Sequence, residues 1–85
     1  ADMFDEDERL DLRVEKISRD QTGTMRISGI AADNKEYDVI TDADTITNFA
    51  YSTLKVNDEV SVYPKNISDG TPSRVEAKAL VKKID

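Results

Sequence analysis

Five basic side chains and one tyrosine are placed so that they could contact single-stranded nucleic acid. Each falls at an outward position of a predicted strand, and such binding needs cations for the phosphates and aromatic rings for the bases. Acidic residues interleave with them, so a solvated, charge-balanced face is the competing interpretation, and the pattern favours it. Tyr37 is predicted to point inward instead. The six candidates are Arg13, Arg26, Tyr63, Arg74, Lys78 and Lys82.

The first eight residues form a second candidate site. They carry five acidic side chains and no basic one, whereas the remaining residues hold 13 acids and 12 bases, so the formal charge of −6 lies mainly in this segment. Like-charged terminal segments are typically disordered, which predicts a solvated tail over residues 1–8. Met3 and Phe4 are its only large apolar residues. They would allow the tail to dock on a partner, or to cover a basic face of its own domain.

The composition excludes several kinds of chemistry. With no cysteine and no histidine, the chain lacks thiol nucleophiles, serine triads and the usual zinc ligands. Asp42 and Asp44 do not begin a calcium-binding loop, because Ile46 and Thr47 stand where that loop needs an oxygen ligand and a glycine. We therefore expect no catalytic residue, no metal site and no cofactor, and we predict that the chain is not an enzyme.

Alternation of apolar and polar residues predicts the strands that would carry these side chains. It runs through residues 9–19, 24–31, 36–41 and 58–63. In the first of these the alternation slips by one position between Val14 and Ile17, which predicts a β-bulge. Asn57 and Asp58 tolerate left-handed backbone, so they predict a tight turn before the fourth strand.

Residues 73–84 fit two different structures. Ser73 and Glu76 match a helical capping box. As in a strand, however, one set of residues alternates with another: Val75, Ala77, Ala79 and Val81 with Arg74, Glu76, Lys78, Leu80 and Lys82. We predict a strand, because a sheet without it would keep an open edge.

Two segments between the strands are predicted from their composition and period. In residues 42–54, Ile46, Phe49, Ala50 and Leu54 fall on one face of a helix, which predicts one short helix. Residues 66–72 are rich in Asn, Ser, Asp, Gly and Pro, which predicts a loop.

The resulting order resembles that of the OB-fold, a Greek-key barrel with a helix between its third and fourth strands. Residues 10–83 resemble small S1-type and cold-shock-type domains, including the bacterial initiation factor made of one such domain. The aromatic RNA-stacking run of cold-shock domains has no counterpart here. Residues 39–42 and 54–62 are also similar to the TOBE barrels of molybdate transport. The likeness to S1-type and cold-shock-type domains lies in residues 12–17, 24–27, 54–60, 69–70 and 74–78.

The expected fold is therefore all-β with one short helix, a five-stranded OB-fold-like Greek-key barrel. We expect an acidic tail over residues 1–8 and one small domain over residues 9–85. The resemblance implies binding of single-stranded nucleic acid, RNA in particular, through the sheet face and residues 65–73.

Two alternative functions stay open. One is a protein-interaction module that uses an edge strand or the acidic tail. The other is small-anion binding as in TOBE barrels, which ranks lowest. No apolar run approaches the length of a membrane span and no signal peptide is visible. We therefore expect a cytoplasmic protein that has no membrane partner. We also expect a monomer.

Overall fold

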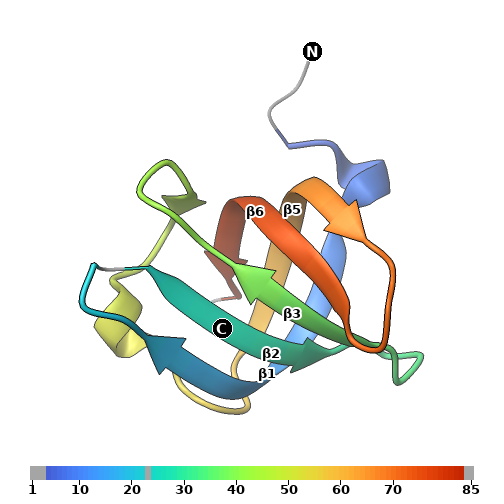
Figure 1. The fold of residues 1–85 in the computed structure, drawn as a ribbon, viewed down its shortest axis with the longest axis horizontal. Helices are drawn as coiled ribbons and strands as arrows, with labels where there is room; N and C mark the ends of the chain where they lie inside the picture. The colour runs from blue at the N-terminus through green and yellow to red at the C-terminus, as the bar shows by residue number, and fades with distance from the viewer. Residues whose placement is uncertain (1–3, 23, 84–85) are drawn as a thin grey trace.

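A computed structural model describes residues 4–22 and 24–83 (Figure 1). The described residues form six strands and two short 3-10 helices. Among them, no helix is long and apolar enough to cross a membrane. The elements, in chain order, are η1 (Glu6–Glu8), β1 (Leu10–Arg19), β2 (Met25–Ile30), β3 (Glu36–Ile40), β4 (Ile46–Thr47), η2 (Tyr51–Thr53), β5 (Glu59–Ser68) and β6 (Ser73–Lys82).

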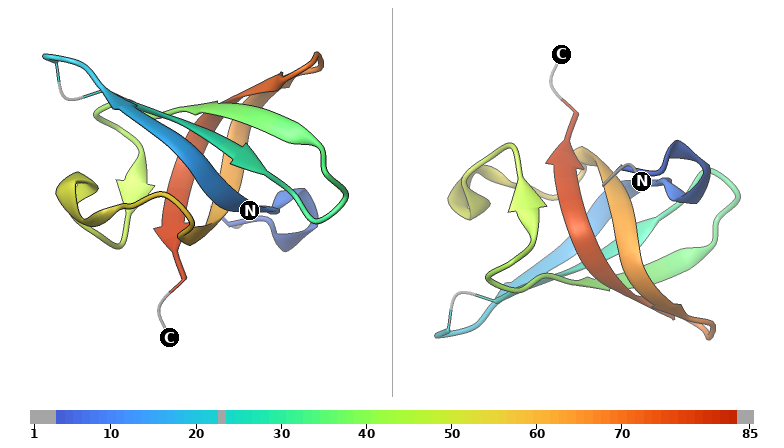
Figure 2. Two further views of the ribbon diagram at one scale, coloured as in Figure 1. Left: turned by 90° about the horizontal axis from the view of Figure 1, so that it is seen from below. Right: turned by 90° about the horizontal axis from the view of Figure 1, so that it is seen from above.

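Five of these strands close into a small barrel. β1, β2 and β3 form an antiparallel meander, and β5 and β6 form a long antiparallel hairpin. Two further pairings join these units: β1 lies antiparallel to β5, and β3 lies parallel to β6. Figures 1 and 2 show that the short β4 lies beside the last part of β6, outside this ring. The predicted all-β barrel is confirmed, and so is the strand predicted over residues 73–84 as far as Lys82, whereas residue 84 lies outside the described part of the chain.

Most of the barrel interior is filled by the alternate apolar residues that the sequence predicts to point inward. The prediction is wrong at the end of β6, where Leu80 and not Ala79 or Val81 joins the core, because the pairing of β5 with β6 shifts register between Tyr63 and Pro64. Leu12 of β1 lies beside Val60 of β5 in the register, and Val14 and Val62 belong to the same cluster; all four are almost fully buried. Tyr37 is buried as predicted. The other members of the core cluster are Met25, Ile27, Val39, Leu54, Val75, Ala77 and Leu80.

Local sequence features set the bend of β1 and the turn before β5. The pairing of β1 with β2 shifts register between Val14 and Lys16, which confirms the predicted bulge. Asn57 has a φ of 78°, in the left-handed region that asparagine tolerates better than most residues. The Asn57 N–H donates to the Val14 carbonyl at 2.8 Å, and the Asp58 carboxylate accepts from the Lys55 N–H at 2.8 Å. The turn predicted at this position is thus confirmed.

The helix predicted within residues 42–54 is wrong. Ile46 and Thr47 form β4 and pair with Ala79 and Leu80, and only one 3-10 turn follows. Threonine side chains are the physical reason, because their hydroxyls bind nearby carbonyls in place of a helical ladder. The Thr47 hydroxyl donates to the Phe49 carbonyl at 3.1 Å, and the Thr53 hydroxyl donates to the Ala50 carbonyl at 2.7 Å.

The loop predicted over residues 66–72 is too long. β5 continues to Ser68, with Ile67 opposite Val75 and Ser68 opposite Arg74. Pairing with β6 satisfies the backbone of these residues, and it outweighs their weak preference for strands. The turn between the two strands is therefore confined to residues 69–72.

Candidate binding surfaces

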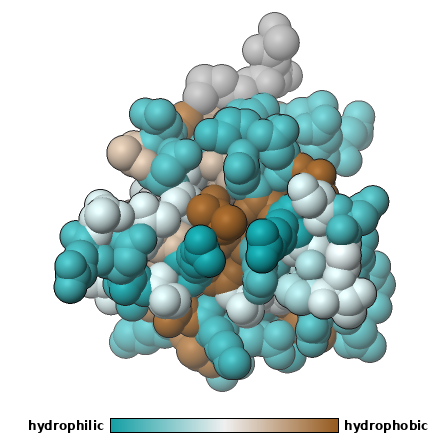
Figure 3. Space-filling view, viewed as in Figure 1, coloured by the Kyte–Doolittle hydropathy of each residue, from teal (hydrophilic) through white to brown (hydrophobic). Residues whose placement is uncertain are grey.

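The outward side chains of β2, β3 and β6 form one candidate surface, the sheet face, which lies on the side of the molecule seen in Figures 1 and 3. Strand register sets its rows. Arg26 lies beside Ile40, which lies beside Glu76; in the next row Ser28 lies beside Asp38, which lies beside Arg74. The sheet face consists of Arg26, Ser28, Asp38, Ile40, Arg74, Glu76 and Lys78.

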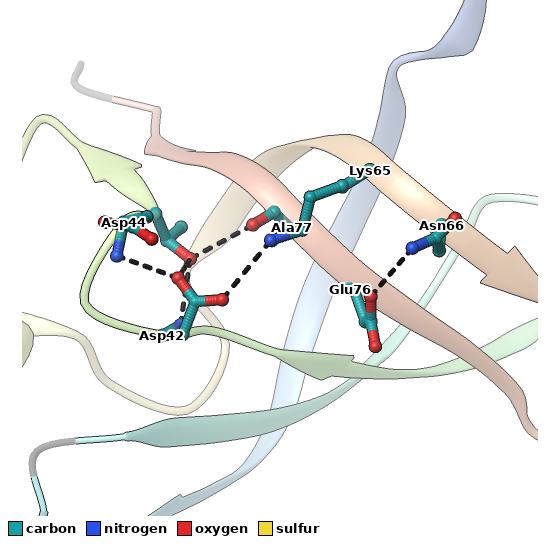
Figure 4. A network of polar contacts seen from close by, with 7 residues as sticks. Asp42, Asp44, Lys65, Asn66, Glu76 and Ala77 are labelled. Carbon is teal, nitrogen blue, oxygen red and sulfur yellow. Dashed lines mark hydrogen bonds and ion pairs between the residues drawn. The ribbon is translucent and has the colours of Figure 1, made fainter.

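Charges of opposite sign alternate across the sheet face. The Asp38 carboxylate accepts from the Ser28 hydroxyl at 3.1 Å, and the Glu76 carboxylate accepts from the Asn66 amide at 2.9 Å (Figure 4). In the described part of the chain, neither Arg26 nor Arg74 makes an ion pair. A shallow cleft of about 380 Å³ on this side is bordered by Glu15, Lys16, Ser28, Gly29, Glu36, Tyr37, Asp38 and Pro72. Three carboxylates and one lysine among these residues make the cleft acidic rather than basic.

The remaining basic candidates lie elsewhere. The Lys82 ammonium contacts the Asp58 carboxylate at 3.3 Å and the Thr53 carbonyl at 3.3 Å, so it ties the end of β6 to the turn before β5. The Lys55 N–H, and then Lys82, hold the pKa of Asp58 below its usual value. Arg13 is exposed on β1, between Ile30 of β2 and Glu59 of β5. Of the five predicted cations, only Arg26, Arg74 and Lys78 share the sheet face.

Arg13 lies instead in a groove with a volume of about 630 Å³. Its sides are the segment around Arg9 and the turn between β2 and β3. The charges along it are mixed, because Arg9, Arg13 and Lys83 lie among Asp11 and Glu59. Lys83 approaches Glu59 to 3.6 Å. No group of three or more acidic residues within residues 4–22 and 24–83 is placed to hold a metal ion.

Tyr63 points out of the barrel, as predicted, but it is not exposed. Only 9% of the residue is accessible, because the N-terminal segment, residues 4–8, covers it. The Phe4 and Tyr63 rings meet edge to face, with centroids 5.0 Å apart and planes at 77°. The Tyr63 hydroxyl donates to Oε1 of Glu6 at 3.0 Å. Both its ring and its hydroxyl are therefore already engaged, and a role for Tyr63 in stacking on bases stays a prediction.

The N-terminal segment is shaped by its own polar side chains. Asp5 caps η1 by accepting from the Asp7 N–H at 3.0 Å. Arg9 donates through Nη1 to Oε2 of Glu6 at 2.7 Å, and its Nε lies 3.2 Å from Oδ1 of Asp11. These two carboxylates, Asp11 first, raise the pKa of Arg9 above its usual value. Disorder of residues 1–8 stays a prediction, and Met3 lies outside the described residues.

Tyr63 belongs to a second surface, the aromatic face. Register places Tyr63 beside Ala79 of β6, and Ala79 beside Ile46 of β4, so that one apolar row crosses three strands. Figure 2 shows β4 on one side of β6, with β5 and then η1 on the other. The aromatic face consists of Phe4, Tyr63, Ala79 and Ile46, of which Phe4 is 39% exposed and Ile46 is 40% exposed.

A polar network stands next to this row (Figure 4). The Asp42 carboxylate accepts from the Asp44 N–H at 2.8 Å and from the Lys65 ammonium at 3.3 Å. These hydrogen bonds, that of Asp44 first, lower the pKa of Asp42. The Thr45 hydroxyl donates to the Ala77 carbonyl at 3.0 Å and so fixes the start of β4 on β6.

Sequence reasoning singled out Phe4 and Tyr63 but did not place them together. The signal available was weak: an aromatic residue next to a capping aspartate, and a tyrosine at an outward strand position. Comparison of the chain with protein-family models, with curated proteins and with solved structures gave no match. The function is therefore argued from the two faces themselves.

Proposed function

We propose that this chain is a non-enzymatic binding domain on an OB-type barrel, and that it binds a protein segment at the aromatic face. The OB-type assignment is supported by the strand connections: an antiparallel meander, an antiparallel pair of β1 with β5, and a parallel pair of β3 with β6. The observation that carries the function is the seating of the N-terminal segment on Tyr63.

The aromatic face has the composition of a small protein-binding surface. Aromatic side chains with one polar atom are enriched at such surfaces, because they give a large contact area at a low entropic cost. Tyr63 supplies the ring and the hydroxyl, while Phe4 and Ile46 leave apolar area open at both ends of the row. On the sheet face, by contrast, the one apolar member, Ile40, is half-buried between the charged Arg26 and Glu76, and none of its members is aromatic.

A selection from a random peptide library tests this proposal. Peptides would be selected on the immobilised full-length chain and on its Phe4→Ala variant, and their affinities then measured for Tyr63→Ala. We expect Tyr63→Ala to weaken binding by at least about tenfold, since buried aromatic anchors dominate small interfaces. The matched control, the double variant Arg26→Ala and Arg74→Ala on the sheet face, should bind as the parent does. If no peptide is selected, or if none depends on Tyr63, the proposal fails.

Single-stranded nucleic acid remains the second candidate ligand. The observation in its favour is that Arg26, Arg74 and Lys78 lie on one outer surface, with Arg26 and Arg74 free of ion pairs in the described part of the chain. Fluorescence anisotropy with labelled single-stranded RNA and DNA at low salt tests it. Binding that weakens steeply with salt and with loss of Arg26 or Arg74 would support this candidate. Absence of binding at high protein concentration would remove it. Monomeric state and cytoplasmic location stay predictions.

A further inference from the structure

We infer that Tyr63 of the aromatic face, together with Arg9, recognises an aromatic residue followed two positions later by a carboxylate, and that Phe4 and Glu6 of the chain occupy this site in cis. This inference rests on the proposed function and names its ligand class. Because the occupant seen in the structure is a short acidic peptide, the partner it fits is an acidic segment of another protein with the same spacing.

The aromatic half of the site is the ring of Tyr63. Phe4 presents to it in an edge-to-face arrangement, with a centroid distance of 5.0 Å. This arrangement sets the positive edge of one ring against the negative face of the other, and it is available to any Phe, Tyr or Trp. An aliphatic side chain would fill the space without that electrostatic contribution.

The carboxylate half of the site is a clamp of two donors. Oε1 of Glu6 accepts from the Tyr63 hydroxyl at 3.0 Å, and Oε2 accepts from Arg9 at 2.7 Å. Asp11 holds the same guanidinium from its other side, through Nε at 3.2 Å. Neither donor belongs to the pair Phe4 and Glu6: Tyr63 is part of β5, and Asp11 of β1 contacts the Arg9 guanidinium independently of that pair. Charge-assisted bonds to both oxygens select a carboxylate over an amide.

The other acids of the segment take no part in this recognition. Asp5 caps η1: its carboxylate accepts from the Asp7 N–H, and its carbonyl accepts from the Glu8 N–H. The cap and the 3-10 turn present Phe4 and Glu6 on the same side, which sets the two-residue spacing. Only Arg9 separates η1 from β1, so the local concentration of the segment is high and a free peptide must compete with it.

Anisotropy with a fluorescein-labelled peptide, Phe-Asp-Glu-Asp-Glu with an acetylated N-terminus, tests the inference. The site is vacated in the full chain by the double variant Phe4→Ala and Glu6→Gln. The matched control is Asp7→Asn with Glu8→Gln, which leaves both contacts to Tyr63 intact. We expect the vacated variant to bind the peptide at least about tenfold more tightly than the parent and the control, because competition in cis is removed.

Two changes sharpen the test. Glu→Gln at the third position of the peptide should weaken binding to the vacated variant, and so should Tyr63→Phe in that variant, which keeps the ring and removes one donor. Equal binding by parent, control and vacated chains, or no binding to the vacated chain, would overturn the inference. Library-selected peptides that depend on Tyr63 but lack the aromatic-and-carboxylate spacing would also overturn it, while leaving the proposed function in place.

Discussion

The sheet face and the aromatic face lie on the same barrel and share strand β6, yet they differ in how their outward side chains are accommodated. On the first, opposite charges on neighbouring strands alternate, so the surface is balanced by its own side chains. On the second, a tyrosine and an alanine lie outside the barrel and are covered by other parts of the chain. A row of polar side chains can stay exposed to solvent, whereas a row of apolar side chains is more stable when other residues bury it.

The burial pattern along β6 shows where one arrangement gives way to the other. From Ser73 to Ala77, buried and exposed residues alternate as expected for a strand with one face in water. Ala79 and Leu80 are then both buried. Leu80 faces the core, and Ala79 lies in the outer row between Tyr63 and Ile46. These two consecutive buried residues thus mark the point where the outer side of β6 is no longer exposed to solvent.

The largest effect should come from a change that disturbs both faces together. Val75 of β6 is fully buried in the core, and the register places it between Val39 of β3 and Ile67 of β5. Val75→Ala should lower the free energy of unfolding by about 2 kcal/mol, through lost burial and a residual cavity. Urea unfolding followed by circular dichroism measures this. A loss no larger than that of an exposed substitution, such as Ile67→Ala, would contradict the core assignment.

A smaller effect, confined to the aromatic face, is expected from Phe4→Ala. The substitution removes the edge-to-face pair, which is worth about 1 kcal/mol of stability. In two-dimensional NMR spectra the changes should be confined to β5, η1 and the neighbouring end of β6, leaving the sheet face unaffected. Shifts spread over Arg26 and Arg74 would show that the two faces are coupled.

The ionisation of Tyr63 should make the stability contributed by the aromatic face, but not that of the sheet face, depend on pH. Burial first, and then the hydrogen bond to Glu6, raise the pKa of Tyr63 above its ordinary value of 10.0. The folded chain favours the neutral phenol. The contribution of Tyr63 to the stability of the fold is therefore fully present below pH 10 and is lost as the pH rises through the raised pKa. Absorbance titration of the phenolate, compared with Tyr63→Phe, measures the shift. Glu6→Gln should bring the pKa of Tyr63 back toward its ordinary value, and the control Asp7→Asn should not.

The smallest effect on stability is expected on the sheet face. Arg26→Gln and Arg74→Gln should each change the free energy of unfolding by less than about 0.5 kcal/mol, as exposed substitutions away from specific contacts usually do. Thermal unfolding at two salt concentrations measures this. A markedly larger, salt-dependent loss would show that the alternating charges do more than balance the surface.

Much of the barrel could be predicted because apolar and polar residues alternate along most of its strands. The bulge of β1, the turn at Asn57 and the inward position of Tyr37 all follow from local period and residue type. The segment after Asp42 could not be assigned in this way. Its apolar spacing fits a helix, whereas threonine hydroxyls and a long-range pairing with β6 determine what forms.

The candidate sites were harder to predict than the fold. Outward positions could be recognised, but their neighbours come from strands far away in the sequence, so the interleaving of Arg74 with Asp38 becomes explicit only with the register. The seating of Phe4 on Tyr63 joins the start of the chain to β5, and no local pattern encodes such a contact.

The parallel pairing of β3 with β6 also has a consequence for how the molecule assembles. The β1–β2–β3 meander and the β5–β6 hairpin are built from neighbouring segments and can each form early. β3 and β6, by contrast, can pair only once the loop formed by the residues between them has closed. Until then the edges of β3 and β6 are open to pairing with other chains. Closure of the ring is therefore the step at which correct folding and self-association compete.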